Sequence, residues 1–421
     1  MNATVHDVAS RTFAALRVRN YRLYFVSQII SFSGTWMQSV ALSWLVLQLT
    51  GSGTALGTVL AAQFLPTLFL APIGGVIADR FDKRKLIVVT QTLAGLLALT
   101  LGIVTLTGVV ELWMVYALAA GFGAVTALDN PSRQTFVMEM VGPDGITNAV
   151  TLNSVVVNAA RAIGPAVSGV VIATFGVGVC FVVNAVSYLA VVIAMLFVRV
   201  AELYPAARSV RAPGQLREGL RYARATPVLI TTIVMLAIVG TLTFEFSTTL
   251  PMFAEFTFGA GAGGLAAMTA LMGAGAVVGG LVVAASSPPS PLRLVAVCAG
   301  FGTAVLLAAV MPTIALAYAT MPLIGAASVS FIAISNATLQ LHSEARFRGR
   351  VMSLFTMALI GSTPVGGPIV GWIGDHAGPR WSLMVGGVAS LAAAAYGWWA
   401  LRWADVDETE APVDSRRLAA A

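Results

Sequence analysis

The sequence predicts an all-α polytopic membrane protein in which twelve transmembrane helices form two six-helix halves. Its 421 residues are 58% hydrophobic and have a mean hydropathy of +0.87, which is too apolar for a soluble domain. Apolar stretches of about 20 residues, enough to cross a hydrocarbon core of ~30 Å, recur along the whole chain. Short motifs of the first half also reappear in the second. These three observations predict a membrane protein built from two similar halves.

The predicted spans follow one another closely, except at one long polar interruption near the middle of the chain. They cover residues 22–48, 54–78, 86–108, 112–128, 149–174, 179–199, 227–248, 262–286, 291–311, 313–338, 350–373 and 381–403. The expected divisions are a tail (1–21), an N-terminal half (22–199), a linker (200–226), a C-terminal half (227–403) and a second tail (404–421). The linker stretch "GQLREGLRYARATP" predicts either a basic amphipathic helix on the membrane surface or a solvated connection.

The basic residues are sorted to one side of this predicted arrangement. Apart from Arg161 and Arg380, every Lys and Arg lies in a tail, in a loop after an even-numbered span, or at the span end beside it. This asymmetry follows the positive-inside rule and predicts that both termini are cytoplasmic. A nucleic-acid-binding surface would not follow loop parity, so the net charge of +6 predicts a lipid bilayer, and no nucleic acid, as the partner.

Polar motifs recur at corresponding places in the two halves. "DNPSRQ" follows the fourth span and "SNATLQ" closes the tenth, and their Asn and Gln residues are separated by the same offset. Gly164-Pro165 in the fifth span is matched by Gly367-Pro368 in the eleventh at nearly that offset. Order and spacing together predict a repeat of six helices plus six, related by an axis along the membrane normal.

The turn between the second and third spans, "GGVIADRFDKRK", carries an unusual concentration of charge for this chain. It resembles the major facilitator signature G-x-x-x-D-(R/K)-x-G-(R/K)-(R/K), although Asp82 stands where the second glycine is expected. The residues in register are Gly75, Asp79, Arg80, Lys83 and Arg84. A small residue allows close helix packing, an aspartate can cap the positive end of another helix, and basic side chains can bond helix C-terminal carbonyls or acids.

Specific contacts are expected for this signature. We expect Asp79 to cap the N-terminus of the eleventh helix near residues 349–352. We expect Arg80 or Arg84 to pair with Asp129, at the predicted cytoplasmic end of the fourth helix. These contacts would form only when the two halves close on the cytoplasmic side, so they would favour an outward-open state.

Most of the chain resembles one branch of the major facilitator superfamily, which contains the enterobactin exporter and related bacterial drug exporters. The resemblance rests on "LRVRNYRLYFVSQIISFSGTWMQSVALSWLVLQLTGS", "NPSRQTFVMEMV", "NAVTLNSVVVNAARAIGPAVSG" and "FRGRVMSLFTM". It implies secondary active export of a small molecule across a bacterial cell membrane, in exchange for protons. Amphipathic drugs, siderophores and other metabolites are the substrates expected, and a monomer is the expected form.

Polar residues inside membrane spans are costly and are therefore candidates for function. A polar face on the first helix and polar residues of the fifth are expected to line the central cavity. They are Gln28, Ser31, Thr35, Gln38, Asn158 and Arg161. Hydrogen bonding between helices is the alternative, although the cavity is favoured for both glutamines and for Asn158. Arg161 lies near the predicted midplane and must find water, an acid, carbonyls or an anionic substrate group.

Glu245 is the one carboxylate placed well inside a predicted span. Burial disfavours the charged form of a carboxylate, which suits a group that takes up and releases protons. A solvated glutamate at the rim is the alternative, because Glu245 lies toward the outer end of its helix. The two Gly-Pro pairs would allow bending or close packing, with a purely structural kink as the alternative.

Other classes of function find little support. The three histidines, His6, His342 and His376, fall in a tail and in two loops on opposite faces, and no catalytic or metal-binding motif appears. We therefore expect no enzyme, no metal and no cofactor. Cys180 and Cys298 fall in apolar spans and are interpreted as small core residues. A proton-driven importer is the main alternative, and a receptor that does not transport is a further one.

Overall fold

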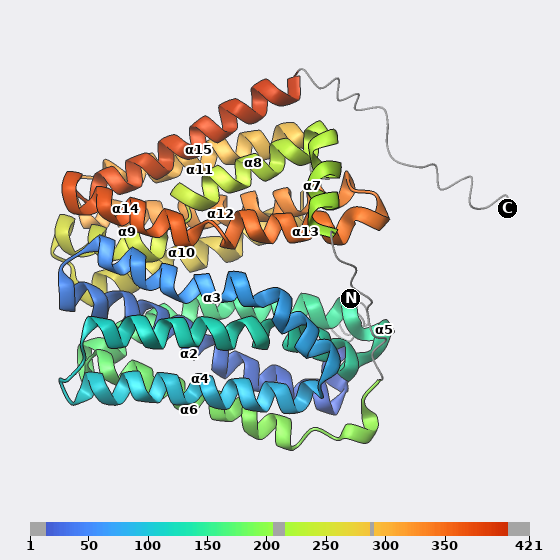
Figure 1. Cartoon of the computed structure of the whole chain (residues 1–421). Coiled ribbons are helices and arrows are strands. Elements are labelled where there is room, and N and C mark those ends of the chain that lie inside the picture. Colours follow the sequence, from blue (N-terminus) through green and yellow to red (C-terminus); the bar gives the residue numbers. More distant parts are fainter. Residues whose placement is uncertain (1–13, 205–214, 287–289, 403–421) are drawn as a thin grey trace, which may run out of the picture.

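The computed structural model describes residues 14–204, 215–286 and 290–402. Most of the predicted N-terminal tail, the middle of the linker and the C-terminal tail lie outside these described residues. Helices α2 to α6 form one bundle and α8 to α15 form a second, and Figure 1 shows the two bundles stacked on each other. The described chain contains eleven helical stretches long and apolar enough to cross a membrane.

The first bundle contains the helices α2 (Arg19–Thr50), α3 (Gly53–Arg80), α4 (Lys83–Leu106), α5 (Leu112–Phe175) and α6 (Val177–Leu196), preceded by the short η1 (Ala14–Arg17). Within it α3 packs on α5, α4 on α6, and α2 on both α5 and α6. The tight turn between α2 and α3 is possible because Gly51 has a φ of 61°. The next residue, Ser52, accepts a hydrogen bond from the Ala55 amide and so caps α3.

Helix α5 supplies two of the twelve predicted crossings. A straight helix of its 64 residues would measure about 96 Å, three times the thickness of a bilayer core. The helical path breaks at Gly142, whose φ of 71° and ψ of 178° are accessible almost only to glycine. The predicted end of the fourth span at residue 128 is therefore wrong, because the helix continues to the break. "DNPSRQ" lies inside α5 and does not follow it.

The second bundle contains α8 (Pro227–Leu242), α9 (Phe246–Met252) with η3 (Phe253–Thr257), α10 (Gly261–Ala284), α11 (Pro291–Ala309), α12 (Ile314–Leu341), α13 (Ala345–Ile360), α14 (Thr363–Ala377) and α15 (Pro379–Arg402). The seventh and eleventh predicted helices are broken here, which the hydropathy pattern did not indicate. The first break leaves Glu245 with a non-helical ψ of 40°. The second falls at Gly361 and Ser362, just before Pro364 at the start of α14. With α5 counted twice, the predicted fold of twelve membrane-crossing helices is confirmed.

The linker contains η2 (Val200–Glu202) and the helix α7 (Gln215–Ala225). The α7 helix lies against α13, as Figure 1 shows near the end of the bundle. The rings of Tyr222 and Phe347 stack with centroids 4.2 Å apart, and Glu218 pairs with Arg350 at 2.9 Å. The predicted linker helix is therefore present, and one side of it contacts protein.

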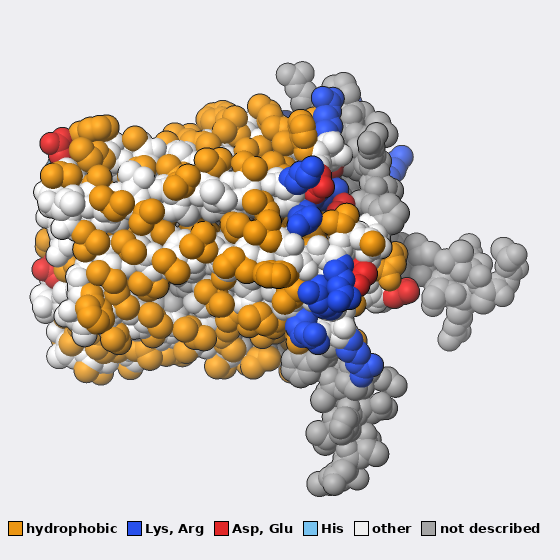
Figure 2. Space-filling view, turned by 90° about the horizontal axis from the view of Figure 1, so that it is seen from below, with side chains coloured by type: hydrophobic (Ala, Val, Ile, Leu, Met, Phe, Trp, Pro, Cys, Tyr) orange, Lys and Arg blue, Asp and Glu red, His pale blue; other side chains and the backbone are white. Residues whose placement is uncertain are grey.

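The charged side chains are unevenly distributed along the molecule. Figure 2 shows a broad hydrophobic band, with Lys and Arg gathered at one end. We call this end, where α2, α4 and α13 begin and α15 ends, the basic end. Arg380 lies at the opposite end, where it donates hydrogen bonds to the carbonyls of Ala309 (2.7 Å) and Met311 (2.8 Å). Arg380 therefore bonds the last carbonyl of α11 and one just beyond its end.

Candidate functional site

The two bundles meet through α3 with α14 and through α5 with α10. The first contact is made backbone to backbone at glycines. An added Cβ at Gly57 would lie 2.2 Å from the Gly367 carbonyl oxygen, and one at Gly371 would lie 2.2 Å from that of Gly53. Such spacing of small residues lets helices approach closely in membranes. We call these four residues the glycine contact.

The glycine contact lies away from the basic end. Gly53 begins α3, and α14 is the part of the eleventh helix remote from the basic end. Its other part, α13, packs on α7, α8 and α12. A Cβ added at Gly349, near the start of α13, would meet no atom within 4 Å among the described residues. The two bundles therefore touch at the opposite end and separate toward the basic end.

Glu245 lies directly behind the glycine contact. The residue is only 2% exposed, which contradicts the alternative of a solvated glutamate at the rim. A Cβ on Gly366 would lie 3.0 Å from Glu245 Oε1, and one on Gly367 would lie 3.4 Å from Oε2. Oε1 has no hydrogen-bond partner among the described residues. A buried carboxylate thus lies at the break in the seventh helix and against α14, the second part of the eleventh.

Arg161 lies over the ring of Trp36, with its guanidinium carbon 4.9 Å from the ring centroid. This distance is typical of a cation–π contact, which compensates part of the cost of burying the charge. Its Nε is buried and has no hydrogen-bond partner in the described chain. Nearby, Gly164 packs against α2, since an added Cβ would lie 2.7 Å from the Ser33 carbonyl oxygen. Within the described part of the chain, the guanidinium is therefore positioned by an aromatic ring and not by an acid.

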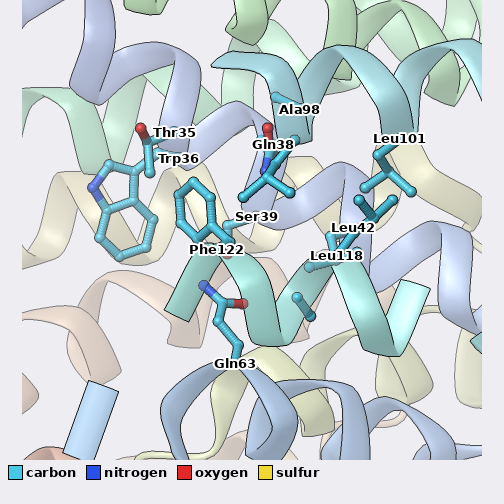
Figure 3. A pocket seen from close by; sticks show the side chains of 12 residues that line it. Thr35, Trp36, Gln38, Ser39, Leu42, Gln63, Ala98, Leu101, Leu118 and Phe122 are labelled. Carbon is cyan, nitrogen blue, oxygen red and sulfur yellow. The ribbon is translucent and has the colours of Figure 1, made fainter. Parts of the chain in front are cut away.

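Two cavities lie on either side of Trp36. Both are lined by Trp36 and by Ser39. The larger, of about 140 Å³, lies within the first bundle, and Figure 3 shows Gln63 projecting from α3 toward Phe122 and Ser39. Its lining consists of Thr35, Trp36, Gln38, Ser39, Leu42, Gln63, Leu97, Ala98, Leu101, Leu118, Ala119 and Phe122. The smaller, of about 50 Å³, lies between α2 of one bundle and α9 and α10 of the other. Apolar walls with a few amides and hydroxyls are typical of small-molecule sites.

Gln28 and Gln38 bond within their own bundle, which was the alternative to lining the central cavity. Gln38 Oε1 accepts a hydrogen bond from Asn184 at 2.7 Å, although the residue also lines the larger cavity. Gln28 is 1% exposed and accepts a hydrogen bond from Arg133. The prediction that Gln28 lines the central cavity is therefore wrong, because its side-chain oxygen accepts a hydrogen bond from the buried guanidinium of Arg133.

The remaining polar residues of this set are placed as follows. Ser31 is buried, and its hydroxyl has no partner among the described residues. Thr35 bonds to the Ser31 carbonyl at 2.9 Å and lies 3.4 Å from the Tyr188 hydroxyl. Asn158 donates to the Ser154 carbonyl of its own helix at 2.8 Å. Only Thr35 and Gln38 of the predicted polar set line the larger cavity.

Arg133 and Asp129 form a buried ion pair that sequence reasoning missed. Arg133 Nε lies 2.5 Å from Asp129 Oδ2, and Asp129 Oδ1 also accepts hydrogen bonds from Thr90 (2.6 Å) and Gln91 (3.0 Å). Both side chains are about a tenth exposed. Asp129 therefore pairs with Arg133 in this arrangement, whereas the expected pairing with Arg80 or Arg84 belongs to the state closed on the cytoplasmic side and stays a prediction. Arg133 was missed because the fourth helix was ended too early, which placed Arg133 in a loop.

The charged turn connects three helices of the first bundle. Lys83 pairs with Glu139 of α5 at 2.6 Å, and Arg84 donates to the carbonyls of Met195 (2.6 Å) and Leu196 (3.1 Å) at the end of α6. The expected bonding to helix C-terminal carbonyls is confirmed for Arg84.

Other residues of the charged turn lie near the end of α3 and the start of α4. Asp82 has an extended backbone and caps α4 by accepting a bond from the Lys85 amide, which explains an acid at the glycine position. Asp79 and Arg80 form the last turn of α3, where Arg80 is exposed.

Close packing is seen at the neighbour of Gly75. Gly75 itself is buried, and an added Cβ at Gly74 would lie 2.1 Å from the Ala127 carbonyl oxygen. Neither Pro165 nor Pro368 interrupts its helix. The Gly-Pro pairs therefore mark close packing, within one bundle at Gly164 and between bundles at Gly367. Cys180 and Cys298 are buried free thiols, as predicted.

Comparison with known proteins identifies the family. The sequence pattern of the family described as "Transmembrane secretion effector" matches residues 10–417. The staphyloferrin A transporter of Staphylococcus aureus (strain NCTC 8325 / PS 47) is 28% identical over 176 residues, which are 42% of this chain and 44% of that protein. The multidrug efflux pump Tap of Mycolicibacterium fortuitum is 28% identical over 82% of this chain and 87% of its own length. The enterobactin exporter EntS of Shigella flexneri is 23% identical over 90% and 88%.

The match to the staphyloferrin transporter thus spans less than half of that protein, whereas each of the other two matches spans more than four fifths of both chains. Among solved structures, a bacterial homologue of the lysosomal transporter Spinster, in an inward-facing and occupied conformation, superposes with a TM-score of 0.73. It is 14% identical and the superposition covers 92% of this chain and 97% of that one. At this identity the likeness shows the fold. The resemblance drawn from the sequence is confirmed, and the chain belongs to the transmembrane secretion effector family of major facilitator transporters.

Proposed function

We propose that this protein exports a small amphipathic molecule from a bacterial cell in exchange for protons, by alternating access. The two halves (22–199 and 227–403) act as the rocking units, and the protein works as a monomer in the cell membrane. The Lys and Arg residues of the basic end support a cytoplasmic location for that end and for both termini. The present arrangement, separated toward the basic end, then corresponds to an inward-open state.

The position of Glu245 carries the proposal. A carboxylate lies where the halves touch, next to Gly366 and Gly367, and one of its oxygens has no hydrogen-bond partner among the residues that the structure describes. A change in its protonation would alter the charge at that contact, so proton binding and opening of the outer gate would be linked. The names of the relatives, two of which are an efflux pump and an exporter, support export over import.

The cavities beside Trp36 support the class of substrate. The larger cavity is smaller than the roughly 300–1,000 Å³ of drug-sized sites, so it would hold one apolar or aromatic part of a molecule. The rest of the molecule would extend into the space between the halves, toward Arg161. Arg161 and the amides of Gln38 and Gln63 would then bind acidic or hydrogen-bonding groups, as drugs and siderophores both carry.

Transport in reconstituted vesicles tests the proposal. Purified protein in proteoliposomes should accumulate a fluorescent amphipathic dye against its gradient when a proton gradient of the correct sign is imposed, and an uncoupler should abolish this. Accumulation driven by the opposite gradient would show a proton-driven importer. No flux of dyes, antibiotics or siderophores under either gradient would favour a receptor without transport.

Glu245→Gln tests the proton step. The variant should lose uphill transport but keep downhill exchange of substrate, because glutamine is uncharged and close in shape. Glu255→Gln is a matched control, since Glu255 is an acid of the same broken helix that bonds to the Gly261 amide at 3.1 Å. Undiminished uphill transport by Glu245→Gln would remove this residue from the coupling mechanism.

Arg161 variants test the substrate contact. Arg161→Ala should raise the concentration needed for half-maximal transport of an anionic substrate more than Arg161→Lys does, because lysine keeps the charge. A neutral substrate should be less affected. Equal transport by the parent and both variants would show that this charge is dispensable.

A further inference from the structure

Asp375 bonds across the two halves at the end opposite the basic end. It belongs to α14, but the hydrogen bonds of its side chain in the described structure are to the N-cap and the first two residues of α3. Its Oδ1 accepts from the Gly53 amide at 2.6 Å. Its Oδ2 accepts from the Thr54 amide (2.9 Å), the Thr54 hydroxyl (2.6 Å) and the Ser52 hydroxyl (2.7 Å). One carboxylate therefore receives four donors from the other half.

The first amides of a helix have no partner within that helix and carry its positive dipole end. Asp375 supplies both a negative charge and two acceptors at this place on α3. Ser52 caps the same helix from within its own half, through the Ala55 amide. The Asp375 cap is thus an additional one, which exists only while the halves touch.

Asp375 is exposed to solvent, so water can replace its four donors when the halves separate. The glycine contact continues from it along α3 and α14, with Gly371 on Gly53 and Gly367 on Gly57. A strong but water-accessible bond at the outer edge of a close helix contact can form and break in each cycle.

We propose that Asp375 is a gating residue, which holds the outer gate closed by capping α3 and releases it when the transporter opens outward. The inference rests on the alternating access of the proposed function. It makes α3 and the eleventh helix a reciprocal pair. Asp375, near the end of the eleventh helix, caps α3 in the present state. Asp79, near the other end of α3, is expected to cap the eleventh helix in the opposite state.

Distances between spin labels test the gate without requiring a substrate. Labels at Val109→Cys and Val310→Cys, both exposed and in different halves at the opposite end, report on the outer gate. The native thiols of Cys180 and Cys298 are buried and are replaced by alanine for this experiment. In Asp375→Asn the ratio of long to short distance should rise roughly two- to tenfold, as for loss of an exposed helix cap.

Thr54→Val should produce a smaller shift in the same direction, because it removes one hydroxyl donor and keeps the amide. Thr54→Val also tests the gate on its own if Asp375→Asn fails to fold. Glu255→Gln, which removes an acid that bonds within its own half, should leave the distances unchanged. Distances in Asp375→Asn and Thr54→Val that equal those of the parent would overturn the gating role. A shift in distances without any measurable transport would support the gate and contradict the proposed export.

Discussion

The glycine contact predicts the effect of adding a single methyl group to α3. In Gly57→Ala the new Cβ would lie 2.2 Å from the Gly367 carbonyl oxygen, 2.3 Å from its carbonyl carbon and 2.6 Å from the Pro368 nitrogen. All three are backbone atoms and cannot rotate away. An ordinary contact needs at least 3.4 Å, so α3 and α14 would have to separate by about 1.2 Å.

This strain falls only on the state in which the halves touch at that end. Adding a methyl group to a closely packed site costs about 1–3 kcal/mol. At 1.4 kcal/mol per tenfold, the balance between inward-open and outward-open states should move by roughly five- to a hundredfold. The helix itself should not suffer, because alanine is the better helix former.

Labelling of a buried cysteine measures this shift. Ser43 is 3% exposed and its hydroxyl donates to the Ser247 carbonyl of the other half, so Ser43→Cys would react with a membrane-impermeant maleimide only when the outer gate opens. Gly57→Ala in that background should react about five- to a hundredfold faster. Gly300→Ala is the matched control, since its Cβ would meet no atom within 4 Å in the described chain. Equal labelling rates in all three proteins would refute the reasoning.

Two further predictions concern the ends of α3 and the break in α5. Asp79→Asn should be expressed normally but transport slowly, because losing a helix cap costs ~0.5–2 kcal/mol and favours the inward-open state. Spin labels at Lys85→Cys and Leu292→Cys, both near the basic end and in different halves, should then be farther apart on average. An unchanged distance distribution would mean that the charged turn between α3 and α4 only sets the topology. Gly142→Ala should lower the thermal unfolding midpoint, because its φ of 71° with ψ of 178° costs a residue with a side chain about 1–3 kcal/mol. A midpoint equal to that of Gly300→Ala would contradict this.

The number and order of the helices could be predicted because hydropathy reports directly which segments lie in the bilayer. The boundaries failed where polar residues are buried in protein. "DNPSRQ" was interpreted as a loop, yet Asp129 and Arg133 neutralise each other inside α5 and so can lie within the helix. The breaks before Phe246 and Thr363 were also missed, since the apolar pattern continues through both.

The site was predicted less completely than the fold. Helical spacing placed Gln28 and Gln38 on one face of the first helix, but it cannot distinguish a face that packs in the core of a bundle from one that lines a central cavity. The partners of Gln28 and Gln38, Arg133 and Asn184, lie more than a hundred residues away in the chain. Arg161 was singled out because an intramembrane charge is rare, whereas its contact with Trp36 depends on how α2 and α5 cross.

The attachment of α7 to α13 has a consequence for dividing the chain into fragments. Glu218 pairs with Arg350, and Tyr222 stacks on Phe347. This part of the linker is therefore expected to move together with the C-terminal half. A gene split before Gln215 would leave that docking intact within one polypeptide, whereas a split after Ala225 would make it an association between two polypeptides. Halves co-expressed from the first split should therefore assemble with α7 packed on α13 as in the intact chain. With the second split, α7 would be held on α13 only by contacts between two polypeptides, so its dissociation would report on the basic end.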